Sequence, residues 1–101
     1  MKEAVTLNPD EPSGWSSYAV ALSRNGRINE AVKAYQNAIE KGTGTRDEFV
    51  YWYNMGYDLF NAGRNREAME AFQRVVEIAP RNDELYENAL RGIGFCKSNM
   101  R

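Results

Sequence analysis

An internal repeat limits the fold of this chain more than any other feature. Trp15 and Trp52 are 37 residues apart, and the same pattern follows each of them. The pattern reads W-x2-[YM]-[AG]-x2-L, then a glycine, then A-x3-[YF]-x2-[AV]. A period of about 20 to 50 residues is typical of arrays in which each repeat packs on the next. We therefore expect a repeat architecture.

Each copy of the pattern predicts two helices. Its apolar and small residues recur in steps of three and four, which indicates amphipathic helices rather than strands. A glycine interrupts each copy, at Gly26 and at Gly63, and glycine readily takes the left-handed conformation that ends a helix. Ala31 and Ala68 follow in the first turns of the second helices, where a small side chain allows close approach. The sequence thus predicts an all-α fold of helix-turn-helix hairpins.

The C-terminal segment predicts one more helix, from Asp83 to Asn99, with Asn82 or Asp83 as its cap. Its apolar residues recur at helical steps, and its L-x2-I-G segment, residues 90–94, matches the first-helix pattern. No partner helix follows before Arg101. We expect a terminal helix that covers the last hairpin, because each repeat buries one apolar face only against its neighbour.

These motifs resemble the tetratricopeptide repeat, whose unit of about 34 residues carries W-x2-L-G-x2-Y, then A-x3-F, then a closing proline. Pro80 stands at the closing position of the second copy. The resemblance implies an α-solenoid of antiparallel helix-turn-helix hairpins, a TPR-like superhelix, with a C-terminal capping helix. We expect one TPR-like domain over residues 1–101. Its parts are the end of a preceding repeat (1–11), repeat 1 (12–45), repeat 2 (46–82) and the capping helix (83–101).

The chain departs from the family pattern between its two copies. Residues 41–46, Lys-Gly-Thr-Gly-Thr-Arg, replace the closing proline and add three residues to the period. One helical turn is about 3.6 residues, so we expect the following helix to start about one turn early. The segment Gly42 to Thr45 is interpreted as a helix stop and turn, since it lacks the ending and the preceding strand of a phosphate-binding loop.

Composition argues against several classes of function. With 13 basic and 14 acidic residues the net charge is −1, which gives no electrostatic basis for binding nucleic acid. No apolar run approaches the ~20 residues of a membrane-spanning helix, so no membrane insertion is expected. Histidine is absent and Cys96 is the single cysteine, which we expect to be a small buried residue. We expect no catalytic residue, no cofactor, no metal and no enzyme activity, and the compartment stays open.

The resemblance also implies where a ligand would bind, because first helices of tetratricopeptide arrays line a concave groove. Trp52, Met55, Gly56 and Leu59 are then expected in the core. Ten residues face the groove as candidates for binding a peptide: Val20, Arg24, Val50, Tyr53, Asn54, Tyr57, Phe60, Asn61, Arg91 and Phe95. In the alternative, Tyr53, Tyr57 and Phe60 pack against Val20 and Phe95 and fill the interior of the array.

The function predicted from these features is a protein-protein interaction module that binds a peptide or partner protein in the groove. Two alternatives stand beside it. One is a self-assembling or scaffolding segment, and hence a homo-oligomer. The other is a non-catalytic accessory region of a larger enzyme or secretion-system protein.

Overall fold

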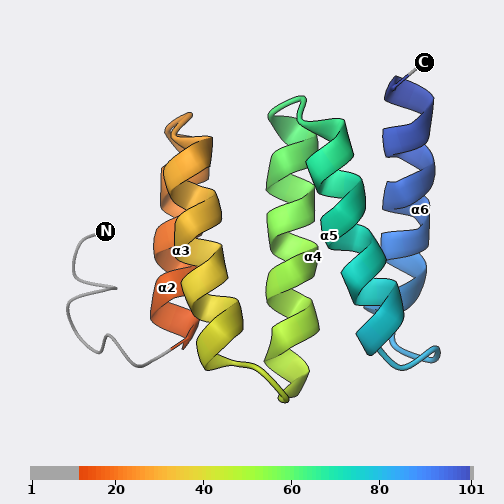
Figure 1. Cartoon of the computed structure of the whole chain (residues 1–101), viewed down its shortest axis with the longest axis horizontal. Coiled ribbons are helices and arrows are strands. Elements are labelled where there is room, and N and C mark those ends of the chain that lie inside the picture. The colour runs from red at the N-terminus through yellow and green to blue at the C-terminus, as the bar shows by residue number, and fades with distance from the viewer. Residues whose placement is uncertain (1–11, 101) are drawn as a thin grey trace. The chain divides into compact units, whose positions relative to one another are not determined.

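The computed structural model describes residues 12–100, and over this range the chain is all-α, as predicted, with five helices and no strand. The helices are α2 (Pro12–Arg24), α3 (Ile28–Lys41), α4 (Arg46–Asn61), α5 (Asn65–Ile78) and α6 (Glu84–Asn99). The expected end of a preceding repeat, residues 1–11, lies outside the described residues. The chain divides within α4 into two compact units, Met1–Tyr51 and Trp52–Arg101. In Figure 1, α2 lies beside α3, and α5 lies beside α6.

The turn between α2 and α3 is a Schellman motif centred on Gly26. Gly26 has a φ of 79°, in the left-handed region that glycine tolerates best. Its N–H donates to the carbonyl of Ser23 at 3.0 Å, and the N–H of Arg27 donates to the carbonyl of Leu22 at 2.9 Å. These two bonds satisfy carbonyls that the end of a helix would otherwise leave without partners. The first glycine predicted from the sequence thus ends α2.

The turn between α4 and α5 repeats this geometry. Gly63 has a φ of 82°, and its N–H donates to the carbonyl of Phe60 at 3.0 Å. The N–H of Arg64 donates to the carbonyl of Leu59 at 2.9 Å. The internal repeat is therefore present in the backbone hydrogen bonds as well as in the sequence, and the predicted helix-turn-helix hairpins are confirmed.

An arginine-glutamate pair follows each turn. Arg27 donates from Nε and Nη2 to the two carboxylate oxygens of Glu30 at 2.7 and 2.8 Å. Arg64 binds Glu67 in the same bidentate way, at 2.6 and 2.8 Å. Such fork-shaped pairs are the strongest form of an exposed ion pair, and each places its carboxylate in the first turn of a helix, where the helix dipole favours it.

The first unit holds α2, α3 and the start of α4. Its core is made of small residues on both helices of the hairpin together with aromatic rings: Ala19, Leu22, Ala31, Ala34, Tyr35, Ala38, Ile39, Phe49 and Tyr51. Ala31 is completely buried, as expected for a small residue at the helix crossing. The ring of Tyr51 lies so close to Gly42 that a Cβ there would be 3.3 Å from it. The start of α4 is thereby attached to the end of α3.

Residues 42–45 form the predicted helix stop and turn. Gly44 has a φ of 85°, and its N–H donates to a carboxylate oxygen of Glu48 at 3.0 Å. The hydroxyl of Thr43 donates to the carbonyl of Ile39 at 2.9 Å, and that of Thr45 donates to the carbonyl of Gly42 at 2.6 Å. The turn leads directly into α4, which begins at Arg46. This start lies six residues before Trp52, in agreement with the expected extension.

The second unit holds the rest of α4, α5 and α6. Asp83 is the N-cap of α6, and its carboxylate accepts from the N–H of Leu85 at 2.9 Å. Ala89 and Cys96 are fully buried on the inner face of this helix. The helix predicted from Asp83 to Asn99, its cap and the burial of the single cysteine are confirmed.

Candidate functional site

Phe72 of α5 occupies the centre of the second unit between two glycines. A Cβ on Gly56 of α4 would lie 2.9 Å from Cε1 and 3.0 Å from Cδ1 of this ring. A Cβ on Gly92 of α6 would lie 2.6 Å from Cε2 and 2.8 Å from Cδ2, on the other edge. Real Cβ atoms do not approach so closely, because protein interiors are packed at van der Waals distance. The ring therefore fits edgewise where neither helix has a side chain.

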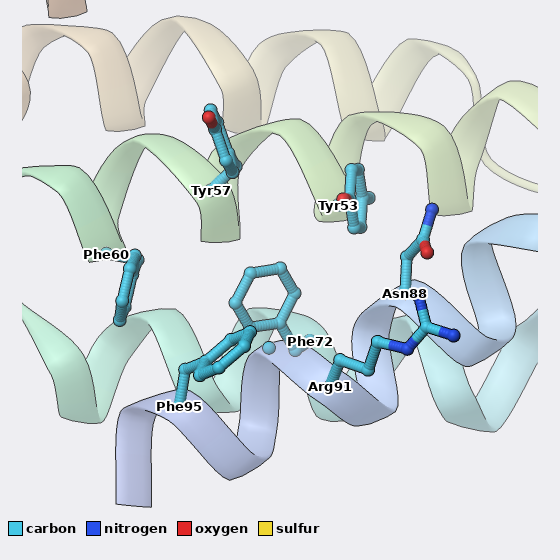
Figure 2. A pocket seen from close by; sticks show the side chains of 8 residues that line it. Tyr53, Tyr57, Phe60, Phe72, Asn88, Arg91 and Phe95 are labelled. Carbon is cyan, nitrogen blue, oxygen red and sulfur yellow. The ribbon is translucent and has the colours of Figure 1, made fainter. Parts of the chain in front are cut away.

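A pocket of about 250 Å³ opens above the Phe72 ring. Figure 2 shows Tyr53, Tyr57 and Phe60 extending from α4, with Asn88, Arg91 and Phe95 on α6 and the Phe72 ring between the two helices. Gly92 completes the lining. All eight residues belong to the second unit.

Aromatic side chains make up most of the lining, and they differ in exposure. The ring centroids of Tyr53 and Phe72 are 5.7 Å apart, and those of Phe60 and Phe95 are 6.5 Å apart, both in tilted arrangements. Tyr57 is 54% exposed and Phe95 is 61% exposed, while Phe72 is only 3% exposed. The pocket thus has a buried aromatic floor and an exposed aromatic rim.

Polar groups of the pocket come mainly from α6. Arg91 lies 3.9 Å from a carboxylate oxygen of Glu87 one turn earlier, and both side chains are largely exposed, so this pair is weak. The amide of Asn88 is half-buried beside it. On α4, burial raises the pKa of the Tyr53 hydroxyl, with smaller contributions from Tyr57 and Glu84. This hydroxyl is neutral at physiological pH and can both donate and accept a hydrogen bond.

Comparison with known families agrees with this geometry. Two family models described as tetratricopeptide repeat match the chain, one over residues 12–40 and the other over residues 49–82, together more than half of its length. The chain belongs to the tetratricopeptide repeat family. These repeats generally mediate protein-protein interaction and are typically non-catalytic. A search of curated proteins found no match.

Five of the ten residues predicted to face the groove line this one pocket of the tetratricopeptide chain: Tyr53, Tyr57, Phe60, Arg91 and Phe95. Asn54 and Asn61 are on α4 but do not line it, and they are half-buried and exposed, respectively. Val20, Arg24 and Val50 belong to the first unit; Arg24 is exposed and the two valines are half-buried. A role for these five outside the pocket stays a prediction.

The expected core of α4 needs one correction. Met55, Gly56 and Leu59 are buried as predicted, but Trp52 is only half-buried. The guanidinium of Arg74 lies over its ring, 5.6 Å from the centroid, so an arginine side chain covers part of the indole in place of a core residue. The sequence pattern marks Trp52 as a motif position but does not show what covers it.

Three pocket residues are not among the ten candidates from sequence: Phe72, Asn88 and Gly92. Phe72 is a second-helix motif residue, and its place at the floor follows from its position between two glycines. Gly92 is a small residue that allows close helix packing, and its contact with the Phe72 ring agrees with this. Gly56 and Gly92 lie inside helices, where glycine costs stability relative to alanine. These two glycines were the sequence signal that could have indicated both Phe72 and Gly92 as pocket residues.

Other kinds of site find no support among residues 12–100. No group of three or more acidic or cysteine side chains there could hold a metal ion. None of the described helices combines the length and apolar character of a membrane span. Burial raises the pKa of the Cys96 thiol, which keeps it protonated and poorly nucleophilic.

Proposed function

We propose that this chain is a protein-interaction module that binds a peptide segment of a partner protein in the aromatic pocket of its second unit. The observation that carries the proposal is the exposure of Tyr57 and Phe95 beside the pocket. Soluble proteins seldom leave clustered large aromatic side chains in water without a use for them. Aromatic residues dominate binding energy at protein interfaces, because they offer a large area at low entropy cost.

The size and chemistry of the pocket suit one or two apolar side chains of such a peptide. A volume of about 250 Å³ is small for a drug-sized ligand, for which pockets of about 300 to 1,000 Å³ are usual. The peptide backbone would lie along the rim, where Asn88, Arg91 and the Tyr53 hydroxyl supply donors and acceptors. Apolar anchors would then provide affinity, and the polar rim would provide orientation.

Selection from a peptide library tests this proposal while the natural partner is still unidentified. Peptides retained by the chain are measured by titration against the parent protein and against Tyr57→Ala and Phe95→Ala. Each substitution should weaken binding by about 1 to 3 kcal/mol, the range of an interface anchor. Both side chains are more than half exposed, so the melting temperature should change little.

A matched control distinguishes binding in the pocket from nonspecific binding to exposed apolar side chains. Leu90→Ala removes an apolar side chain of similar exposure from α6, the helix that carries Phe95. Leu90 does not line the pocket, so this substitution should leave peptide affinity unchanged. Peptides that bind all four proteins equally, or a library that yields no binder, would contradict the proposal. A large loss of stability in Tyr53→Ala would identify that residue as part of the floor rather than of the binding surface.

A further inference from the structure

The two hairpin turns share their backbone geometry but differ in the residue before the glycine. The first turn contains Asn25-Gly26, and the second contains Ala62-Gly63. Among the asparagines of the sequence, only Asn25 is followed by glycine. The backbone nitrogen of the next residue can attack the amide carbon of an asparagine side chain, and a glycine has no side chain that hinders this approach. The first turn therefore holds a reactive pair that the second turn lacks.

The surroundings of Asn25 leave its side chain open to this reaction. Asn25 is exposed, and within residues 12–100 no hydrogen bond or ion pair holds its side-chain amide. Apart from the flanking residues, no described atom lies within 4 Å of the place where a Cβ on Gly26 would be, so water also reaches the turn. Arg24 and Arg27 stand on either side of the pair, and their positive charges favour loss of the proton from the Gly26 nitrogen.

We propose that Asn25 is a site of spontaneous deamidation, a covalent modification of the first hairpin. The Gly26 nitrogen loses its proton and forms a bond to Cγ of Asn25, while the bond from Cγ to the side-chain nitrogen breaks. Ammonia leaves with the proton, and a succinimide ring remains. Water then opens the ring at either carbonyl and gives aspartate or isoaspartate, so that one water molecule is consumed for each ammonia released.

The fold controls the rate of this reaction through one hydrogen bond. The N–H of Gly26 donates to the carbonyl of Ser23 at 3.0 Å, which holds the nitrogen away from the side-chain amide. This bond lies at the end of α2, where local opening costs much less free energy than unfolding of the whole chain. The reaction therefore proceeds from a state in which only the last turn of α2 has opened.

Deamidation weakens the first hairpin and leaves the second unit unchanged. Isoaspartate inserts one extra carbon into the main chain directly before Gly26, inside the loop that the two hydrogen bonds of the turn close. Aspartate adds a negative charge at the end of α2, where the helix dipole disfavours it. All residues of the aromatic pocket belong to the second unit, so this modification is independent of the proposed function.

Mass spectrometry of the intact chain during incubation in mildly alkaline buffer tests the proposal. Each event replaces a side-chain NH2 by OH, and digestion after glutamate places Asn25 and Asn29 in one fragment, residues 12–30. Fragmentation of this peptide should show that Asn25 reacts at least about tenfold faster than Asn29, which precedes a glutamate. In urea, where the turn is always open, Asn25 should react about tenfold faster still.

Two substitutions exchange the turns and serve as matched controls. Asn25→Ala gives the first turn the Ala-Gly pair of the second and should abolish the modification. Ala62→Asn gives the second turn an Asn-Gly pair and should create a new, somewhat slower site, because Asn61 stands where the first turn has Arg24. After incubation, the parent chain should melt at a lower temperature than before, while Asn25→Ala should keep its melting temperature.

Several results would overturn the proposal. One is an unmodified Asn25 in the folded chain after the urea-unfolded chain has reacted fully, because the bond to Ser23 would then prevent the reaction. Another is an equal gain of mass in Asn25→Ala, because the modification would then lie elsewhere in the chain. A third is the absence of any reaction in Ala62→Asn. An unchanged melting temperature of the fully modified chain would show that the turn tolerates the product.

Discussion

The two hairpins of this chain have nearly identical turns but differ in how their centres are filled. Gly26 and Gly63 have φ values within a few degrees of each other, and the same two backbone hydrogen bonds close each turn. At the centre, the first hairpin has Ala19 where the second has Gly56. In the second, the ring of Phe72 lies against Gly56 of α4 and Gly92 of α6. Positions that are the same in both copies thus define the turns, and positions that differ shape the pocket of the second unit.

The same contrast holds for the residues predicted to face the groove. Where the first hairpin has Ser16, Val20 and Ser23, the second has Tyr53, Tyr57 and Phe60. All three aromatic residues line the pocket. A tetratricopeptide scaffold can therefore gather aromatic side chains in one repeat, because the hydrogen bonds of the turns do not depend on these positions.

The largest effect is expected from removing the Phe72 ring, which lies between two glycines of the second unit. Phe72→Ala should lower the free energy of unfolding by about 3 to 5 kcal/mol, since it leaves a cavity between α4, α5 and α6. Urea denaturation followed by circular dichroism measures this loss. A cost below about 1 kcal/mol would show that the ring does not hold the three helices together.

Adding a methyl group beside the ring should be the next most costly change. Gly92→Ala would place a Cβ 2.6 Å from the Phe72 ring, whose other edge already lies against Gly56. The clash should outweigh the gain in helix propensity and destabilise the chain by about 1 to 2 kcal/mol. Gly94→Ala, two residues along the same helix and open to solvent, is the matched control and should stabilise by up to about 1 kcal/mol. Equal effects of the two substitutions would contradict the observed position of the ring.

Exchanging Ala19 and Gly56, the matching small residues of the two hairpins, tests how differently the two centres are packed. Gly56→Ala gives the second hairpin the residue of the first, and we expect a net loss of up to about 1 kcal/mol as the clash with Phe72 offsets the better propensity of alanine. Ala19→Gly makes the reverse change and should cost about 1 kcal/mol through propensity alone. Thermal melts of both variants check the result. A clear gain of stability in Gly56→Ala would mean that the two centres are packed alike.

Replacing the turn glycine should lower the free energy of unfolding by the same amount in both hairpins. Gly26→Ala and Gly63→Ala each place a Cβ at a positive φ, which costs about 1 to 2 kcal/mol for an L-residue. Neither site has a described atom within 4 Å of the added Cβ, so the cost is conformational and not steric. Denaturation curves should therefore give the same loss for the two variants, and a difference above about 1 kcal/mol would break the equivalence of the turns.

The smallest effect concerns the ion pair after the second turn. The hydrogen bonds from Arg64 lower the pKa of Glu67 below its ordinary value of 4.5. A lowered pKa stabilises the fold above the unfolded-state pKa, and this contribution disappears as the pH falls through the folded-state value. Glu67→Gln should thus cost about a few tenths of a kcal/mol near neutral pH, because the pair is partly exposed, and this cost should shrink as the pH falls below the ordinary range of a carboxyl group. A cost independent of pH would exclude the ion pair as its cause.

Local signals made most of the fold predictable from sequence. Glycine at a turn, alanine at a helix crossing and aspartate at an N-cap each act within one or two helical turns, so Gly63, Ala68 and Asp83 could be placed correctly. The pocket was only partly predictable. Its floor depends on Phe72 meeting Gly56 and Gly92 from two other helices, and no short-range pattern encodes that three-way contact. The motif at Trp52 likewise could not show that Arg74 covers it.

The edgewise fit of Phe72 also bears on how the second unit opens. Because one ring touches the backbone of both α4 and α6, neither helix can separate from α5 without exposing the same buried side chain. Local opening of one helix alone is therefore costly, and the three helices should exchange their amide hydrogens with solvent as one cooperative unit. Protection factors at the centres of α4, α5 and α6 should then converge on a common value, set by the free energy of opening that unit as a whole.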